Sequence, residues 1–344
     1  MATIKRLVII LFIYALSAPL SAQRLERGQR QSWNPSRTWV FAVGILEFEH
    51  GDSWDSFPKE GRKDAELVDF FRQSGVPRDQ ILFIKDREAT KDRIERALTR
   101  FLSKAGEGDM LIFYYTGHGA EDDASGKIYF ASYDASDDLA RTAWSVSSIF
   151  DTVERNFRGS RALLLADCCY SGALADEALR RRSSVSYAVL TSARSDSLST
   201  AEWTFTDALL RGLRGNSKID QNRDGEIELS ELARYEKSRM WSKEEQVAVF
   251  KTTGDFSPEM IMVDVAGRDV AARSASRIKE RVEVEWEGNW YPATILEVRG
   301  AKYRIHYLGY GSEWDEWVDD SRLRSTSKVA PADRRLNQYE ASHG

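Results

Sequence analysis

Apolar runs alternate with amphipathic segments through the first 265 residues. Runs of strand length that are apolar throughout occupy residues 38–48, 80–86, 109–119, 161–169, 186–195 and 247–254. Hydrophobic positions recur at helical spacing in residues 64–75, 90–106, 146–157, 205–215 and 229–241. Residues 127–135 suggest a further short strand or hairpin. Apolar strands that alternate with helices predict an α/β fold, in which a mostly parallel sheet is flanked by helices on both faces.

The pattern changes after this α/β region. Residues 266–276 are small and polar, which indicates a linker. Residues 277–324 contain short β-rich runs separated by glycine turns, so we expect a small C-terminal β-barrel. Residues 325–344 lack core-forming side chains, and we expect a disordered tail.

The N-terminus has the pattern of a targeting segment. Lys5 and Arg6 precede a ten-residue apolar run, and small residues follow as far as Ala22. This predicts a secretory signal peptide over residues 1–22 and a secreted or periplasmic protein. The alternative is an uncleaved segment that anchors the chain in a membrane. The polar residues 23–36 are expected to form a flexible lead-in.

Composition limits the chemistry that the chain can carry. The 344 residues have a formal net charge of −5, which argues against a nucleic-acid partner, and 42% of them are hydrophobic, enough for a proper core. The two cysteines, Cys168 and Cys169, are sequence neighbours, and neighbours rarely form a disulfide because the geometry is strained. A free thiol in an exported protein calls for a chemical explanation.

A histidine and a cysteine follow two of the apolar strands. "YYTGHG" places His118 after one strand, and "DCCYSG" places Cys169 after another, 51 residues later. Ligand sites of parallel sheets lie outside the carboxyl ends of the strands, so the two side chains are expected at the same edge. A thiolate attacks a carbonyl, and an imidazole can take and return the proton. Each residue taken alone is better explained as structural, either a turn histidine or a small buried cysteine.

Together these motifs resemble the caspase and metacaspase family of cysteine peptidases. The similarity runs from about Val40 to Val265 and defines a peptidase domain over residues 37–265; it includes "GRKDAELVDFF" and "FTDALLRGL". The resemblance implies that His118 is the general base and acid and that Cys169 is the nucleophile. It also implies an oxyanion hole built from the backbone N–H groups of Gly119 and Cys169.

The same resemblance suggests a substrate. The acids with which metacaspases bind a P1 arginine or lysine correspond to Asp64 and Asp167, so the implied partner is a protein or peptide with a basic P1 residue. The alternative is structural, with Asp64 capping a helix and Asp167 bonding at a strand end. The competing function is a catalytically silent caspase-fold scaffold whose C-terminal barrel binds a peptide or protein.

Residues 220–231, "DQNRDGEIELSE", fit the pattern of an EF-hand calcium loop. Gly225 stands at the turn position, and the expected ligands are Asp220, Asn222, Asp224, the Glu226 carbonyl and Glu231. The peptidase chemistry itself requires no cofactor. A bound calcium ion would therefore modulate or stabilise the protein and take no part in the reaction. The alternative is a polar turn in which Ser230 starts a helix.

Residues 277–324 resemble the Tudor-knot or chromo-barrel type of domain. The resemblance places an aromatic cage on Tyr291, Tyr307, Tyr310 and Trp314. Such a cage attracts a cation through cation–π interactions, so the implied partner is a peptide ligand of the barrel. The alternative is that these rings form the core of a very small barrel.

Overall fold

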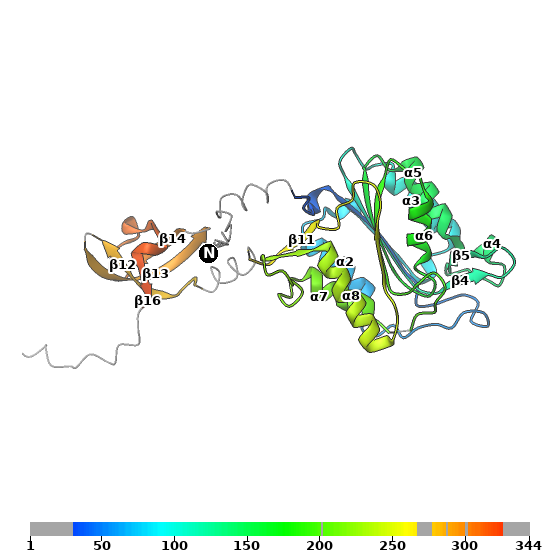
Figure 1. The fold of residues 1–344 in the computed structure, drawn as a ribbon. Coiled ribbons are helices and arrows are strands. Elements are labelled where there is room, and N and C mark those ends of the chain that lie inside the picture. The colour runs from blue at the N-terminus through cyan, green and yellow to red at the C-terminus, as the bar shows by residue number, and fades with distance from the viewer. Residues whose placement is uncertain (1–29, 201, 267–276, 287, 300–301, 326–344) are drawn as a thin grey trace, which may run out of the picture. The chain divides into compact units, whose positions relative to one another are not determined.

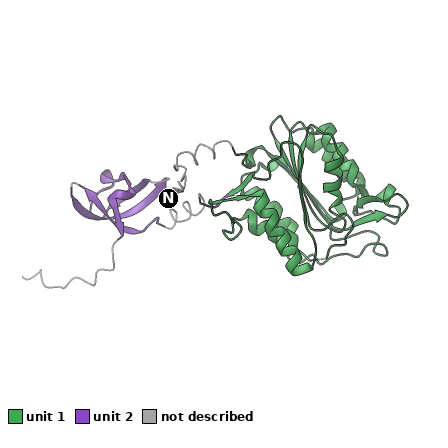
Figure 2. Cartoon of the chain, in the orientation of Figure 1, with its two compact units in different colours: residues 1–263 green, residues 264–344 purple. Residues whose placement is uncertain are grey.

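The computed structural model describes residues 30–325, apart from 201, 267–276, 287 and 300–301. The chain divides into two compact units, residues 1–263 and residues 264–344 (Figure 2). The predicted signal peptide and nearly all of the predicted linker and tail lie outside the described residues. None of the described helices combines the length and apolar character needed to cross a membrane.

Within the described residues, a six-stranded sheet forms the centre of the first unit, in the order β10-β8-β7-β3-β1-β2 (Figure 1). Neighbouring strands are parallel except for β10, which is antiparallel to β8. The strands are β1 Thr38–Gly44, β2 Ile81–Lys85, β3 Met110–Thr116, β7 Arg161–Asp167, β8 Ser186–Thr191 and β10 Val249–Thr252. The predicted mostly parallel α/β sheet is therefore confirmed.

Helices cover both faces of this sheet (Figure 1). Those on one face are α2 Lys63–Gln73, α7 Thr204–Leu213 and α8 Leu229–Glu244. Those on the other face are α3 Lys91–Leu102, α5 Val146–Asn156 and α6 Ala173–Arg180. The sequence pattern predicted each of these helices except α6, which is short and rich in alanine.

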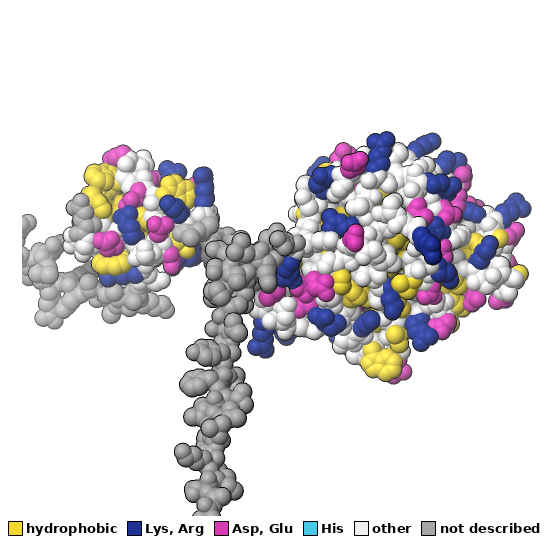
Figure 3. Space-filling view, turned by 45° about the horizontal axis from the view of Figure 1, so that its top comes forward, with side chains coloured by type: hydrophobic (Ala, Val, Ile, Leu, Met, Phe, Trp, Pro, Cys, Tyr) yellow, Lys and Arg dark blue, Asp and Glu magenta, His cyan; other side chains and the backbone are white. Residues whose placement is uncertain are grey.

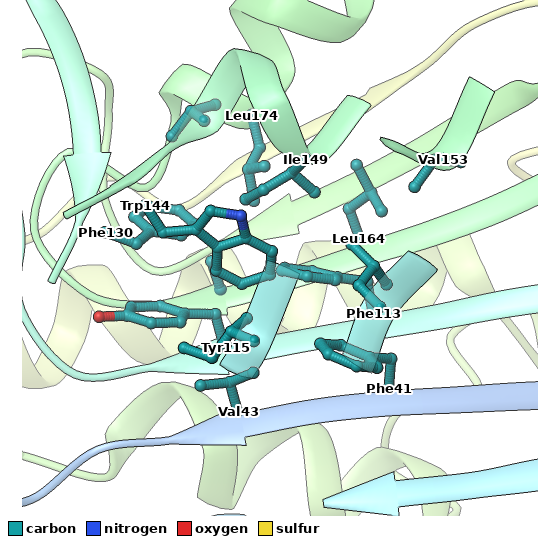
Figure 4. Close-up of a cluster of buried hydrophobic side chains, with 14 of the residues drawn as sticks. Phe41, Val43, Phe113, Tyr115, Phe130, Trp144, Ile149, Val153, Leu164 and Leu174 are labelled. Carbon is teal, nitrogen blue, oxygen red and sulfur yellow. The ribbon is translucent and has the colours of Figure 1, made fainter. Parts of the chain in front are cut away.

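The core between the sheet and α3, α5 and α6 combines aromatic rings with aliphatic side chains (Figure 4). Phe41, Phe113 and Tyr115 come from β1 and β3, and each is fully buried. They meet Trp144 and the helix side chains that complete the cluster. Because β1, β3 and β7 are apolar on both faces, their carboxyl ends are held firmly by the packing on either side.

Two small sheets flank the central one. β4 Gly119–Asp122, β5 Lys127–Phe130 and β6 Trp144–Ser145 form an antiparallel sheet, with the short α4 Leu139–Thr142 before β6. β9 Glu226–Glu228 pairs with β11 Ile261–Asp264. β4 starts directly after His118, so the histidine lies at the junction of a core strand and a surface hairpin.

The described part of the expected flexible lead-in is ordered, and here the structure differs from the prediction. Ser32 bridges to Ile261, the backbone N–H of Trp33 donates to the Ile261 carbonyl at 2.8 Å, and Trp33 is buried. Pro35–Arg37 form a 3₁₀ turn into β1. The polar composition of this segment concealed one buried tryptophan that ties it to the domain.

The second unit is an antiparallel sheet in the order β15-β14-β13-β12-β16, which agrees with the predicted small β-structure. Its strands are β12 Arg281–Trp286, β13 Asn289–Arg299, β14 Lys302–Tyr307, β15 Glu316–Asp319 and β16 Leu323–Ser325. Val282, Val284, Ile295 and Ile305 are fully buried and form the centre of its core. A bulge between Ile295 and Glu297 bends the longest strand, which helps a small sheet to curve.

Candidate active site

The two predicted catalytic segments follow neighbouring strands whose last residues are paired with each other. Thr116, the last residue of β3, pairs with Asp167, the last residue of β7. His118 and Cys169 each lie two residues beyond this pair. Gly119 packs so closely against the second segment that a Cβ there would overlap the Cys169 carbonyl oxygen. Only glycine permits this approach, and it holds the two segments side by side.

His118 and Cys169 line one cleft with a volume of about 550 Å³. The ionisable residues of its lining, besides His118 and the two cysteines, are Asp55, Glu60, Asp167 and Glu202; lysine and arginine are absent from the described lining. Over the face of the larger unit visible in Figure 3, by contrast, basic and acidic side chains are intermingled. The described lining of the cleft therefore carries acidic side chains without basic ones.

His118 sits in an aromatic box formed by the loop after β1. Its ring lies 4.9 Å from Phe48, 5.4 Å from Trp54 and 4.5 Å from Phe57, measured between ring centroids. Burial among these rings lowers the pKa of His118 below its ordinary 6.5. Nε2 lies 2.7 Å from the backbone oxygen of Asp55, and because a carbonyl only accepts, Nε2 carries the hydrogen. Nδ1 is then the basic nitrogen of the neutral ring.

The two cysteines have different environments. Cys168 is 3% exposed and belongs to the hydrophobic core, where burial raises the pKa of its thiol. Cys169 is half-buried and reaches the cleft. Its Sγ accepts the backbone N–H of Ser199 at 3.0 Å and donates to the Ser199 carbonyl at 3.6 Å. Both cysteines contribute to the cleft lining, and Cys169, the more exposed of the two, is the one that the family resemblance assigns as nucleophile.

The segment 197–199 lies directly against the nucleophile loop. The N–H of Tyr170 donates to the Ser197 carbonyl at 2.9 Å, and the hydroxyl of Ser199 donates to Gln246 at 3.1 Å. Tyr170 has a φ of 55°, a left-handed conformation that is uncommon for an aromatic residue. The turn after Cys169 is therefore held in an unfavourable conformation by its surroundings.

Asp167 lines the cleft but is only 7% exposed. Its Oδ2 accepts the Thr206 hydroxyl at 2.6 Å and the Thr206 N–H at 3.3 Å, and that hydroxyl also lies 2.8 Å from the Tyr114 hydroxyl. Burial outweighs these hydrogen bonds and raises the pKa of Asp167 to about 6. The carboxyl group is thus half-ionised near pH 6.

Asp64, the other acid of the predicted pair, lies elsewhere. It is fully buried at the start of α2, and it does not line the cleft. Both of its oxygens accept hydrogen bonds from Arg62, at 2.8 and 2.6 Å, and Arg62 also binds Asp86 at 2.7 Å. The structure does not bring Asp64 and Asp167 together as two free carboxylates, and a shared role in substrate recognition stays a prediction.

The predicted calcium loop has the expected backbone but closed side chains. Gly225 has a φ of 85°, and β9 follows the turn and pairs with β11. The carboxylate of Glu231 accepts the N–H groups of Gln221 and Asn222 at 2.8 and 3.1 Å. No group of three or more acidic, histidine or cysteine side chains is close enough to hold a metal in the described part of the chain.

A cation from the N-terminal segment covers this loop. Arg30 donates to Asp224 at 3.2 Å and to Glu226 at 3.0 Å, and it also pairs with Glu228. An acidic loop thus carries an internal counter-ion. The calcium ligand set stays a prediction, since these carboxylates would have to turn away from the backbone and from Arg30 to hold a metal.

The four predicted cage residues do line one pocket of the second unit. Tyr291, Tyr307, Tyr310 and Trp314 surround a pocket of about 250 Å³, with neighbouring rings 6.1 to 6.5 Å apart. The remaining lining residues are Trp286, Glu313, Asp315 and Glu316. Tyr307 also belongs to the barrel core, so one ring serves both of the roles considered from the sequence.

The arginines of this unit cover other rings. Arg277 lies over Tyr303 at 4.6 Å, Arg299 over Trp317 at 5.0 Å and Arg324 over Trp290 at 4.2 Å. Among the described residues, no such stacked cation occupies the aromatic pocket. The pocket therefore presents uncovered rings beside carboxylates.

Sequence reasoning missed several residues around the dyad. The aromatic box, Asp55 and Glu60 come from the loop between β1 and α2, and Ser199, Glu202 and Trp203 come from the loop after β8. A signal for the first loop was available: residues 46–60 form a long connection with three aromatic side chains. Long loops beside the carboxyl ends of parallel strands usually carry function.

Comparison with known families agrees with this geometry. The family described as the caspase domain matches residues 59–255, more than half of the chain, and the Tudor-knot family, described as the RNA binding activity-knot of a chromodomain, matches residues 276–325. The chain belongs to the caspase domain family and carries a Tudor-knot domain after it. Both resemblances noted in the sequence are confirmed, and a caspase-like protease domain implies a protein substrate.

Solved structures show more distant likenesses. The chain is similar to protein GSU0716 from Geobacter sulfurreducens, with 14% identity and a TM-score of 0.49 over 64% of this chain and 95% of that one. It is similar to the Drosophila initiator caspase Dronc, with 10% identity and a TM-score of 0.41 over 67% of this chain and 84% of that one. The chain is also similar to the solved structure of Tbtudor, with 27% identity and a TM-score of 0.14; the match covers 14% of this chain and 93% of that one. Comparison with curated proteins gave no match.

Proposed function

We propose that this protein is a cysteine endopeptidase that cleaves after arginine or lysine, with Cys169 as nucleophile and His118 as general base and acid. The observation that supports it is the composition of the cleft: both residues line it, together with four carboxyl side chains and no lysine or arginine in its described lining. A peptide carbonyl can lie between the thiol and the imidazole, while a cationic P1 side chain is attracted by the acids.

The proton transfers follow from the tautomer of His118. Because Nε2–H donates to Asp55, Nδ1 is free to take the proton of the Cys169 thiol. The sulfur then bonds to the carbonyl carbon, and the C–N bond breaks as Nδ1–H gives its proton to the leaving amine. Water, deprotonated by the same nitrogen, hydrolyses the thioester and restores the thiol. Burial keeps the imidazole neutral, and so ready as a base, at neutral pH.

The oxyanion of each intermediate needs donors beside the sulfur. The backbone N–H groups of Gly119 and Cys169 are the candidates, since these two residues are in direct contact. In the protein without substrate, the Cys169 thiol is hydrogen-bonded to the backbone of Ser199. The substrate carbonyl would replace the Ser199 carbonyl as the group that faces the sulfur.

Specificity is tested with peptides that differ only at P1. We expect fluorogenic peptides ending in Arg or Lys to be cleaved and the Asp peptide to be refused, with activity lost in Cys169→Ala. Preference for Asp would contradict the proposal. A silent scaffold would show no cleavage and only slow alkylation of Cys169 by iodoacetamide at neutral pH, whereas an activated thiol reacts fast.

For the Tudor-knot domain we propose a cationic peptide ligand, bound in the aromatic pocket. The uncovered rings favour an ammonium or guanidinium group, and Glu313 adds attraction while it disfavours a nucleic-acid backbone. Asp315 and Glu316 also line the pocket but are already paired, with Arg304 and Arg322 respectively. Calorimetry with a methyl-lysine peptide tests this. Trp286→Ala should weaken binding about tenfold, since a cation–π contact contributes about 1–2 kcal/mol. The matched control is Trp317→Ala, whose ring is already covered by Arg299; equal loss in both variants would contradict a specific cage.

We further propose that the loop 220–231 binds calcium and stabilises the unit around it. The support is the order of its oxygen-bearing residues and the glycine turn at Gly225. Calorimetry should show binding in the wild type and a clear loss of affinity in Glu231→Gln. Unchanged affinity in that variant would argue against the loop.

A further inference from the structure

Hydrogen bonds between side chains connect the nucleophile segment to the end of α8. The backbone N–H of Cys168 donates to the Ser192 hydroxyl at 3.1 Å, and this hydroxyl lies 3.3 Å from that of Ser199. The Ser199 hydroxyl donates to Oε1 of Gln246 at 3.1 Å. A hydroxyl carries a single hydrogen, so Ser199 accepts from Ser192, and Gln246 is the acceptor at which the chain of bonds ends. Gln246 thus reaches the nucleophile segment although it does not line the cleft.

The half-buried side chain of Gln246 is held in place by the way in which α8 ends. Glu245 has a φ of 54°, a left-handed conformation that stops the helix and turns the chain. The backbone N–H of Gln246 then donates to the Met240 carbonyl at 3.3 Å. Glu244, the last residue of the helix, accepts a hydrogen bond from the Thr204 hydroxyl. The end of α8 therefore holds the connection between β8 and α7 through two side chains.

The backbone of Ser199 engages the Cys169 sulfur twice. The Ser199 N–H donates to Sγ at 3.0 Å, and Sγ lies 3.6 Å from the Ser199 carbonyl oxygen, to which the thiol donates. The N–H of Tyr170 donates to the Ser197 carbonyl at 2.9 Å and fixes the same segment from its other end. While the thiol hydrogen points to the Ser199 carbonyl, it is not offered to His118. A reacting peptide therefore has to displace this carbonyl from the sulfur.

We propose that Gln246 is a positioning residue for the nucleophile. Through the Ser199 hydroxyl, it holds the Ser199 backbone against the Cys169 sulfur and keeps the thiol engaged until a substrate displaces it. The effect on cleavage rests on the proposed function above, whereas the effect on the thiol can be measured without cleavage. The apparent affinity for a substrate is reduced by the fraction of molecules in which the sulfur is already released. Gln246 sets this fraction from the end of α8.

Three variants of the full chain test this role through the rate at which iodoacetamide alkylates Cys169 at neutral pH. Gln246→Met keeps the length of the side chain but has no acceptor, and Gln246→Glu keeps an acceptor oxygen. Ser199→Ala removes the hydroxyl and leaves the backbone N–H and C=O groups at the sulfur. We expect alkylation about fivefold faster in the Met and Ala variants, which corresponds to about 1 kcal/mol, the usual contribution of one hydrogen bond. The Glu variant should react no faster than the wild type.

A double variant and the steady-state kinetics separate this role from a general loosening of the fold. Ser199→Ala combined with Gln246→Met should be alkylated no faster than either single variant, because both changes remove the same bond. With the P1 arginine peptide, Gln246→Met should lower KM about fivefold and leave kcat unchanged, since the substrate displaces Ser199 from the sulfur in both proteins. Additive effects of the two changes, or a lower kcat at unchanged KM, would contradict the inference.

The outcomes distinguish this inference from the proposed function. If Gln246→Met is alkylated at the wild-type rate or more slowly, the role of Gln246 fails, whether or not the protein cleaves peptides. If alkylation is faster but neither protein cleaves the P1 arginine peptide, the proposed function fails and the role of Gln246 stands. Equal rates in the Met and Glu variants would show that the acceptor oxygen is unimportant and would overturn the inference. Should Gln246→Met fail to fold, Ser199→Ala decides, because it deletes a single oxygen atom.

Discussion

Replacing Asp167 by asparagine removes a charge that the folded protein holds at a cost. The pKa of this carboxyl group rises from an ordinary 3.8 to about 6 because burial disfavours the ionised form. Each pKa unit corresponds to about 1.4 kcal/mol, so ionised Asp167 destabilises the folded state by about 3 kcal/mol at pH 7.5. Asparagine has nearly the same shape and keeps an oxygen that can accept from Thr206.

The sign of the pH dependence follows from the raised pKa. The folded protein binds this proton more tightly than the unfolded chain, so stability from this group is greatest at low pH and is lost as the pH rises through about 6. Between pH 4.5 and pH 7.5, the wild type should lose about 2 kcal/mol that Asp167→Asn does not lose.

Urea unfolding of both proteins at the two pH values measures this difference. Any constant effect of the asparagine on hydrogen bonding cancels between the two conditions, and so does the contribution of the second unit, which is identical in both proteins. An equal change with pH in the two proteins would refute the reasoning. Such a result would mean that Asp167 titrates at its ordinary value and is better hydrated than the structure indicates.

Three further predictions concern other sites. The fall of kcat/KM at low pH should lie below pH 6.5, and Phe57→Ala should move it to higher pH by admitting water around His118; a move to lower pH would contradict the burial argument. Gly119→Ala should lower kcat at least about 100-fold, because the added Cβ would overlap the Cys169 carbonyl oxygen and push apart the two segments that carry the oxyanion N–H groups, and retained activity would refute the contact. Arg30→Ala should raise calcium affinity in calorimetry about fivefold, by removing about 1 kcal/mol of competition, whereas weaker binding would contradict the counter-ion.

Much of the fold could be predicted because its strands are apolar on both faces. The runs at residues 109–119 and 161–169 had to be buried, and their alternation with amphipathic segments left few arrangements other than a parallel sheet. The sequence pattern did not predict α6, because eight residues with three alanines and one leucine on the buried side give a weak periodic signal. The strand β9 was not predicted, because it lies within residues 220–231, whose sequence matches a calcium-binding loop.

The candidate site could be predicted only where chemistry coincides with strand ends. His118 and Cys169 were found because each follows an apolar run. The contacts of Asp55 and Ser199 with them span 63 and 30 residues and involve backbone atoms, which leave no mark on residue type. Likewise, a sequence shows that Asp64 is acidic but not that an arginine two residues earlier folds back and neutralises it.

Thr116 and Asp167 are paired in adjacent strands, and this register makes the protein sensitive to chain length at one point. Adding or deleting a residue inside β7, without unfolding it, would exchange the inward and outward sides of everything that follows. The Cys168 thiol, which is now buried in the core, would then face the surface, and the Cys169 thiol would face the core. We therefore expect insertions to be tolerated better in the loops that precede β7 than within the strand. A register shift of one residue decides which of the two thiols faces the solvent.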